Sequence, residues 1–285
     1  MTAIHELLKA IDNLKPMPAI MNQIMTVMEN PRSSMQEIAE VIQLDPIITA
    51  TILKICNSAY FGLPRQIESL NDAITYLGME QIIDIVIIKS GTQSFAGKQV
   101  GYGLYEGELW KHAVLSAMTA KDIADKLGIK QKHVIFTTAL LKDIGKIILD
   151  RFVRDSFDRI NMMVKDKGMS FREAEKAVLG IDHAEAGAIL AKKWNFSQKM
   201  IEIIKNHHFN EKSSQYDEEN SIIYIADNVC MMMGVGIGAD GLAYRFHEEV
   251  LNRLGITDKG LQEIISRFSE NMQKVEKMLN AMENL

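Results

Sequence analysis

Apolar residues recur at intervals of three and four along almost the whole chain, whereas the alternating pattern of a half-buried strand never lasts more than a few residues. In the stretch DPIITATILKIC, for example, Ile48, Ile52 and Ile55 fall on one side of a helix. Asp45 can accept hydrogen bonds from the free amides of a helix start, and the following proline fits the first turn. The pattern therefore predicts an all-α fold.

Helix-breaking residues divide the N-terminal third of the chain into several short helices. The helix after Asp45 is predicted to end near Ser58, because a glycine and a proline follow it. Ser69 then precedes a second short helix, which Gly78 ends. Between about residues 91 and 107 five glycines fall among polar residues, so this stretch is predicted to be a loop or linker.

Helical periodicity resumes beyond the linker. Helices are expected at residues 108–128, 132–152, 171–179, 183–193, 198–207 and 218–232. Residues 234–241, GVGIGADG, follow no strand and are predicted to be a flexible connection rather than a dinucleotide-binding loop. The expected organisation is an N-terminal helical subdomain at 1–95, a helical bundle at 104–256 and a long C-terminal amphipathic helix at 257–285.

The C-terminal helix carries a different apolar pattern. Thr257 is predicted to cap its start. Beyond it the apolar residues keep a strict four-three spacing, at Leu261, Ile265, Phe268, Met272, Val275, Leu279 and Met282. This spacing is typical of the seam that two packed helices share. The helix either packs back on its own domain or joins a second copy in a homodimer, and the sequence leaves both open.

The composition excludes several classes of protein. Of 285 residues, 47% are hydrophobic and 24% charged, which is typical of a globular chain. The net charge of -5, and the absence of clustered basic residues from the short N-terminal helices, argue against nucleic-acid binding. No apolar run approaches about 20 residues, so neither a membrane span nor export is predicted. The two cysteines, Cys56 and Cys230, suit a reducing compartment, and we expect a cytoplasmic protein.

Residues with metal-binding side chains recur in and around the helices of the predicted bundle. They are His112, Asp143, His183, His207, His208 and Asp227. Imidazole and carboxylate groups hold Fe, Mn or Zn, and helical bundles collect such ligands from several helices. Taken singly, each histidine is more simply explained as a surface or hydrogen-bonded helix residue, so spacing alone does not establish a metal site.

A series of motifs follows in a characteristic order along most of the chain. They are LKPMPAIMNQIM, LDPIITATILKICNSAYFGLP, AITYLG, LWKHAVLSA, ALLKDIGKIIL, LGIDHAEAGAIL, WNF and NHH, within about residues 10–230. This order resembles the HDOD family, a regulatory relative of the HD-domain metal-dependent phosphohydrolases. The resemblance implies an N-terminal helical subdomain followed by an HD-like helical bundle, used in bacterial signal transduction and without demonstrated enzymatic activity.

The resemblance also assigns positions in the site. The catalytic core of the HD superfamily has a histidine, a His-Asp pair and a distal aspartate. His112 matches the first position, Asp143 the aspartate of the pair and Asp227 the last. Lys142 stands in place of the histidine of the pair. A protonated lysine has no lone pair to offer a metal, so this degenerate site has one damaged metal position.

A second metal position survives in the sequence. In the HD branch that cleaves cyclic di-GMP, a second metal is held at the positions that match Asp143, His183, His207 and His208, so one Fe, Mn or Zn ion is a candidate cofactor. The same branch carries a Gly-Tyr-Pro signature after its histidine pair. This chain reads FNEKSSQYDEENSIIY there, with neither glycine nor proline, and cyclic-dinucleotide hydrolysis is therefore not expected.

The two lysines near Asp143 each have two interpretations. The Lys142 ammonium could pair with Asp143 or Asp227 and hold the pocket together without a metal. Alternatively, Lys142 could point away while one ion occupies the surviving ligands. Lys146 could lie near a phosphate, as in HD enzymes, or be solvated or ion-paired.

The segment most typical of the family also has two interpretations. Asn57, Tyr60 and Phe61 could form a partner or ligand surface. They are more simply explained as a tight turn whose aromatic rings pack against neighbouring helices.

These patterns together predict a non-catalytic regulatory protein that acts through contacts with signalling proteins in trans. The alternative is a residual metal-dependent phosphohydrolase that acts on a nucleotide or a phosphomonoester, because a bound metal could still activate water.

Overall fold

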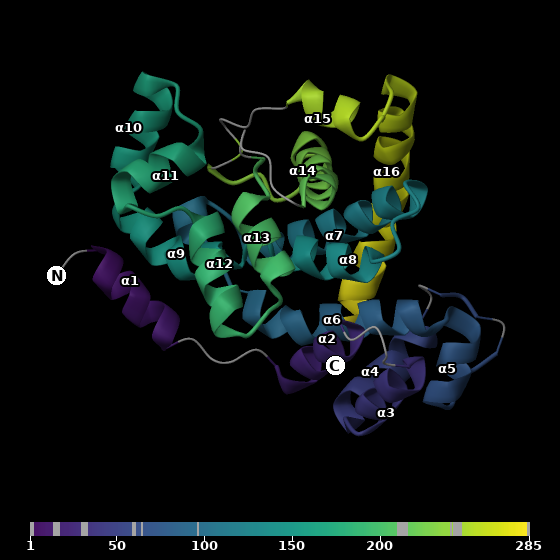
Figure 1. Ribbon diagram of the computed structural model, residues 1–285. Coiled ribbons are helices and arrows are strands. Elements are labelled where there is room, and N and C mark those ends of the chain that lie inside the picture. The colour runs from purple at the N-terminus through teal and green to yellow at the C-terminus, as the bar shows by residue number, and fades with distance from the viewer. Residues whose placement is uncertain are drawn as a thin grey trace. The chain divides into compact units, whose positions relative to one another are not determined.

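A computed structural model describes residues 3–13, 18–29, 34–58, 61–63, 65–95, 97–209, 216–239, 241 and 247–283. These residues are mostly helical, as Figure 1 shows, and the all-α prediction is confirmed. Among them no strand occurs, and the extended pairing is limited to an isolated bridge between Gln99 and Leu104. None of the described helices is both long enough and apolar enough to cross a membrane.

The chain divides into two compact units. The larger comprises Met1–Lys15 and Phe95–Phe268, and the smaller comprises Pro16–Ser94 and Ser269–Leu285. The division at Ser94 lies next to the end of the predicted N-terminal subdomain. Two features differ from the expected organisation, because the first fifteen residues join the larger unit and the C-terminal helix contributes to both.

The smaller unit contains consecutive short helices. They are α2 (Ala19–Glu29), α3 (Met35–Gln43), α4 (Pro46–Cys56), α5 (Leu70–Leu77) and nearly all of α6 (Met79–Phe95). The Asp45 carboxylate accepts from the backbone N–H groups of Ile47 and Ile48, both at 3.0 Å, and begins α4 as predicted. Ser69 caps α5, and Gly78 follows its last residue, also as predicted.

Helix α6 is buried on nearly every side. Its isoleucines and valine between residues 82 and 88 are at most 2% exposed, so it is a core helix. It continues to Phe95 and so occupies the first part of the predicted linker, because tertiary packing offsets the low helix propensity of Gly91. Beyond it lie the short 3-10 helix η1 (Val100–Tyr102) and then α7, which begins at Glu108.

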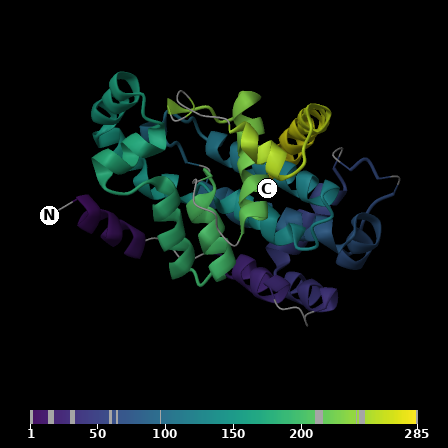
Figure 2. The same ribbon diagram turned by 45° about the horizontal axis from the view of Figure 1, so that its top comes forward.

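The larger unit is a helical bundle. It contains α1 (Ala3–Asp12), η1, α7 (Glu108–Lys126), α8 (Lys132–Leu141), α9 (Ile144–Asp155), α10 (Phe157–Lys167), α11 (Phe171–Leu179), α12 (His183–Lys193), α13 (Gln198–Asn206), α14 (Asp217–Met232), α15 (Glu248–Arg253) and the first part of α16 (Asp258–Glu283). Helix α12 packs against both α9 and α13, and α7 packs against α8 and α14. Figures 1 and 2 both show α12 and α13 side by side.

The helix predicted at 132–152 is two helices, and the prediction of one continuous helix is wrong. Helix α8 ends and α9 begins around Lys142 and Asp143, whose side chains turn inward and are 0% and 1% exposed. A Cβ at Gly145 would lie 1.9 Å from the carbonyl oxygen of His183, so α9 and α12 approach one another backbone to backbone. This approach brings Asp143 close to the start of α12.

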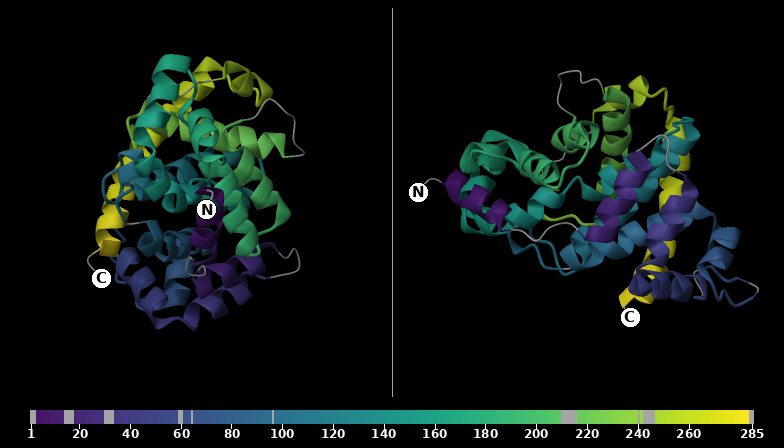
Figure 3. Two further views of the ribbon diagram at one scale, coloured as in Figure 1. Left: turned by 90° about the vertical axis from the view of Figure 1, so that its left-hand side faces the viewer. Right: turned by 60° about the horizontal axis from the view of Figure 1, so that its bottom comes forward.

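Helix α16 is one continuous helix that contributes to both units, drawn in yellow in Figure 3. The Thr257 hydroxyl accepts from the Gly260 N–H at 3.2 Å, which supports the predicted cap. Its buried positions are Ile264, Phe268, Asn271, Val275 and Met278. Four positions of the predicted seam are only half-buried: Leu261, Ile265, Met272 and Leu279. The buried stripe therefore includes Phe268 and Val275 of the predicted seam but leaves its other described positions half-buried, while the side chain of Met282 falls outside the described residues.

Candidate metal centre

One half of the candidate site contains carboxylates and a lysine. His112 from α7, Asp143 and Asp227 from α14 gather in the larger unit. His112 Nε2 lies 2.8 Å from Asp227 Oδ1 and 4.0 Å from Asp143 Oδ2. The Lys142 ammonium donates to Asp143 and lies 2.8 Å from Asp227 Oδ1. The interpretation in which Lys142 points away is therefore wrong, because its side chain is buried between the two carboxylates.

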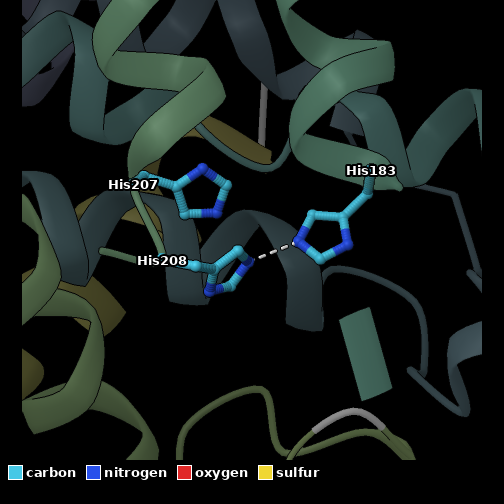
Figure 4. Close-up of side chains that lie close together, drawn as sticks. All are labelled: His183, His207 and His208. Atoms are coloured by element: carbon cyan, nitrogen blue, oxygen red, sulfur yellow. Dashed lines mark hydrogen bonds between the residues drawn. The ribbon is translucent and has the colours of Figure 1, made fainter. Parts of the chain in front are cut away.

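The other half contains the remaining three histidines. His183 is the first residue of α12, and His207 and His208 directly follow α13. Figure 4 shows their rings turned toward one another. His183 Nε2 lies 2.6 Å from His208 Nε2. Asp143 Oδ1 lies 3.8 Å from His183 Nε2 and 3.9 Å from His207 Nε2, so Asp143 belongs to both halves.

Hydrogen bonds decide which ring nitrogens face the cluster with a lone pair. His207 Nδ1 donates to the Ile204 carbonyl at 2.7 Å, which leaves its buried Nε2 without a hydrogen-bond partner. His183 Nδ1 donates to the Glu175 carboxylate at 2.8 Å, so its Nε2 also faces the cluster. Two nitrogen lone pairs 2.6 Å apart repel one another. When no metal is bound, a proton must therefore lie between these two nitrogens.

Asp143, His183 and His207 have the spacing of ligands to one transition-metal ion. Two ligand atoms that each lie about 2.1 Å from an ion are at most about 4.2 Å apart. The distances from Asp143 Oδ1 to His183 and His207, 3.8 and 3.9 Å, are within that limit. Imidazoles with a carboxylate form a set that holds Fe, Mn or Zn. The unpartnered Nε2 of His207 is the atom that such an ion would satisfy.

The cluster holds an ionised carboxylate, Asp143, beside two ammonium groups. Burial alone would raise the pKa of Asp143, but the ammonium groups of Lys142 and Lys146 outweigh burial and hold that pKa well below its usual range. Lys146 Nζ lies 3.0 Å from Asp143 Oδ1, so Lys146 is ion-paired and buried. Burial lowers the pKa of His207 to about 3, which keeps that ring neutral. The cluster thus presents an anionic oxygen beside a neutral imidazole.

The sequence analysis missed two residues behind His183. Glu175 of α11 is buried and accepts from the His183 ring, and the Tyr102 hydroxyl donates to Glu175. Burial alone would lower the pKa of His183, but the Glu175 carboxylate outweighs burial and raises it. Glu175 had a signal, because it lies four residues from both Phe171 and Leu179 and so interrupts an apolar stripe. Tyr102 stands between two glycines, and no sequence pattern marks it as part of a site.

The segment predicted to be a flexible connection forms a wall of the site. The Val235 carbonyl accepts from His112 Nδ1 at 2.9 Å. Gly236 has φ of +62°, and a Cβ there would lie 2.7 Å from the His112 Cβ. Val235 and Gly236, within the predicted connection, therefore pack closely against His112.

The turn near Asn57 belongs to the smaller unit, whereas these ligands belong to the larger one. The Asn57 amide donates to the carbonyls of Leu53 and Ile67 at 2.9 and 2.8 Å and accepts from the Ile67 N–H at 2.8 Å. Asn57 thus joins two backbone segments, which favours the interpretation as a packed turn. Phe61 is half-buried, and Tyr60 lies outside the described residues.

Comparison with known proteins identifies relatives of the same architecture. The HDOD domain family matches residues 14–209. An HDOD domain protein of unknown function from Geobacter sulfurreducens is 23% identical, with 99% of this chain and 97% of that chain covered and a TM-score of 0.73. A candidate phosphohydrolase from Shewanella amazonensis SB2B is 22% identical, with 97% of each chain covered and a TM-score of 0.71.

Two further relatives are longer than this chain. A candidate signal transduction protein from Marinobacter aquaeolei VT8 is 17% identical and has a TM-score of 0.77, with 99% of this chain and 66% of that chain covered. An uncharacterized protein from Treponema pallidum is 20% identical over 198 residues, which is 70% of this chain and 38% of that protein. The matched region thus spans well under half of the Treponema protein.

Proposed function

The chain belongs to the HDOD family, and we propose that it is a regulatory signal-transduction protein that does not hydrolyse cyclic dinucleotides. The observation that carries this proposal is the place of Lys142, whose ammonium lies between the carboxylates of Asp143 and Asp227. The resemblance implies that HD phosphodiesterases hold two metal ions. An ammonium between these two carboxylates occupies the position of the first ion. The likeness to a candidate signal transduction protein agrees with this role.

We further propose that the pocket holds one Fe, Mn or Zn ion, through Asp143, His183, His207 and His208. A bound ion would supply positive charge and Lewis acidity at this point. The proposed ligands belong to three helices, because they lie at the start of α9, the start of α12 and the end of α13. Binding would stabilise their present arrangement relative to any other, which is the physical requirement for a signal.

The partners in this proposal are other signalling proteins, which act in trans. Helix α16 is a candidate contact, because its Ile265, Met272 and Leu279 remain only partly covered. A homodimer through this helix is one form such a contact could take. Sedimentation of the wild type and of a Met272→Glu variant tests it, since a dimer through this face should dissociate in the variant.

A residual metal-dependent phosphohydrolase is the second candidate, supported by the intact histidine half and by the likeness to a candidate phosphohydrolase. The test is metal analysis of the purified protein, followed by a screen of phosphate esters and cyclic dinucleotides with added Mn²⁺ and Fe²⁺. The regulator predicts uptake of one metal equivalent and no turnover. Turnover that is lost in the Asp143→Asn variant would favour the enzyme. Absence of metal uptake would contradict the metal site.

A further inference from the structure

A buried chain of hydrogen bonds leads away from His183. Glu175 Oε2 accepts from the backbone N–H and from the ring Nδ1 of His183, each at 2.8 Å. The Tyr102 hydroxyl donates to the other carboxylate oxygen, Oε1. Glu175 and Tyr102 are both 0% exposed, so water does not compete for these bonds.

The outer end of this chain is held firmly in the fold. The Gly101 N–H donates to the Asp150 carboxylate at 2.8 Å, and a Cβ at Gly101 would lie 2.1 Å from the Asp150 carbonyl oxygen. Helix η1 therefore lies directly on the backbone of α9, where a larger residue than glycine does not fit. This contact fixes the neighbouring Tyr102, whose hydroxyl in turn orients the Glu175 carboxylate.

The charge of Glu175 acts on His183 in particular. Among the described residues, His183 is the ion-pair partner of Glu175, and no lysine or arginine lies within 4.0 Å of its carboxylate. A carboxylate that accepts from Nδ1–H fixes the tautomer of an imidazole and makes the opposite nitrogen, Nε2, a stronger ligand. That opposite nitrogen is the one that faces His208 and Asp143.

We propose that Glu175, oriented by Tyr102, is the positioning residue that sets how tightly His183 holds the metal ion. The inference rests on the proposed metal site and deepens it. Glu175 acts through His183 and does not contact the ion. Tyr102 acts through Glu175, one step further away, so its removal should have the smaller effect.

The test is a titration of metal-free protein with Zn²⁺ in competition with a chromophoric chelator. Glu175→Gln keeps the size of the side chain and an oxygen for His183 but removes the charge. We expect it to weaken Zn²⁺ binding by about 10–100-fold. Tyr102→Phe should weaken binding less. Glu173→Gln on the same helix and Tyr105→Phe, whose side chain is exposed, should leave the affinity unchanged.

The outcomes distinguish a failure of this inference from a failure of the proposed metal site on which it rests. Wild-type protein that takes up no Zn²⁺ overturns the metal site itself, and this inference with it. Uptake by the wild type with equally tight uptake by Glu175→Gln overturns only the role of Glu175.

A spectroscopic measurement distinguishes positioning from a purely structural role. Nitrogen NMR of the metal-free protein at alkaline pH reports which ring nitrogen of His183 carries the proton. We expect Nδ1–H in the wild type and in Glu175→Gln, and a mixture of tautomers in Glu175→Ala. A mixture in the wild type, or Nδ1–H alone in Glu175→Ala, would overturn the inference.

Discussion

The ammonium nitrogen of Lys142 lies 2.8 Å from Asp227 Oδ1, and both side chains are closed off from solvent. Burial alone would lower the pKa of Lys142, but the carboxylates of Asp143 and Asp227 outweigh burial and raise it, so the lysine stays charged. The buried carboxylates of this pocket are thus neutralised on one side by the protein itself. We propose that a metal ion adds positive charge on the other side of the pocket, among the histidines.

Replacement of Lys142 should destabilise the fold strongly. Lys142→Met leaves two buried carboxylates short of a cation, and we expect a loss of about 3 kcal/mol or more in the free energy of unfolding. Urea denaturation at neutral pH measures it. Lys132→Met is the control, because the pair of Lys132 with Asp125 is partly exposed and should contribute no more than about 1 kcal/mol. Equal losses in the two variants would contradict the role of Lys142.

Removal of the metal should lower the stability of the wild type through the histidine half. An ion present at about 100 times its dissociation constant adds about 2.7 kcal/mol to the free energy of unfolding. We expect a chelator to abolish that increment, and His207→Ala to lack it with or without metal. His247→Ala changes a histidine of the same unit outside both ligand groups and should keep the increment. Thermal denaturation with and without Zn²⁺ measures each case.

Gly145 should tolerate no side chain. A Cβ there would lie 1.9 Å from the His183 carbonyl oxygen and 2.7 Å from the Gly187 nitrogen, so Gly145→Ala must push α9 and α12 apart. Overpacking of this kind costs about 1–3 kcal/mol and more where backbone is in the way. Gly97→Ala, with no atom nearer than 3.9 Å, is the matched control and should unfold like the wild type. Metal affinity should fall only in Gly145→Ala, because that substitution also displaces His183.

Both cysteines should be unreactive in the folded protein. Burial raises the pKa of the Cys56 thiol to about 11, and it raises the pKa of the Cys230 thiol well above its ordinary value. The thiolate is the reactive form, so a disulfide reagent should modify neither at mildly alkaline pH until urea is added. Rapid modification of the native protein would contradict the burial of these thiols.

The same shift predicts a dependence of stability on pH. The unfolded thiol of Cys56 ionises near its ordinary pKa of 9.0, before the folded one does. Its contribution to stability is therefore complete below that pH and is lost as the pH rises through the folded value of about 11. The wild type should accordingly lose more stability than Cys56→Ala over this range, as urea denaturation can measure.

Local signals in the sequence predicted much of the fold. Contacts between residues far apart in the sequence could not be predicted in this way. Asp45 and Ser69 marked helix starts correctly, because a capping side chain bonds amides within three residues of itself. The break at Lys142 was missed, since apolar periodicity continues through it and neither glycine nor proline marks it. The contact of Tyr102 with Glu175 joins residues 73 apart, and no local pattern could bring them together.

The sequence predicted which residues form the site, but not how they are arranged in two groups. All six candidate ligands were named from the sequence. The structure gathers them into two groups of three, and Asp143 of one group lies within 3.9 Å of two histidines of the other. Which way Lys142 points depends on the turn between α8 and α9, and that turn follows from the close packing at Gly145. A one-residue difference in the end of α8 would direct the lysine elsewhere, and periodicity does not resolve helix ends so finely.

Lys142 is a cation that the chain carries by covalent bonds, so it has no dissociation rate and no chelator can extract it. The carboxylates around it are neutralised from the moment the protein folds, whatever the supply of metal. An ion held by the histidines would instead come and go with its concentration. A pocket with permanent charges at Lys142 and Lys146 and one exchangeable charge would register metal availability while its buried acids stay paired in either state.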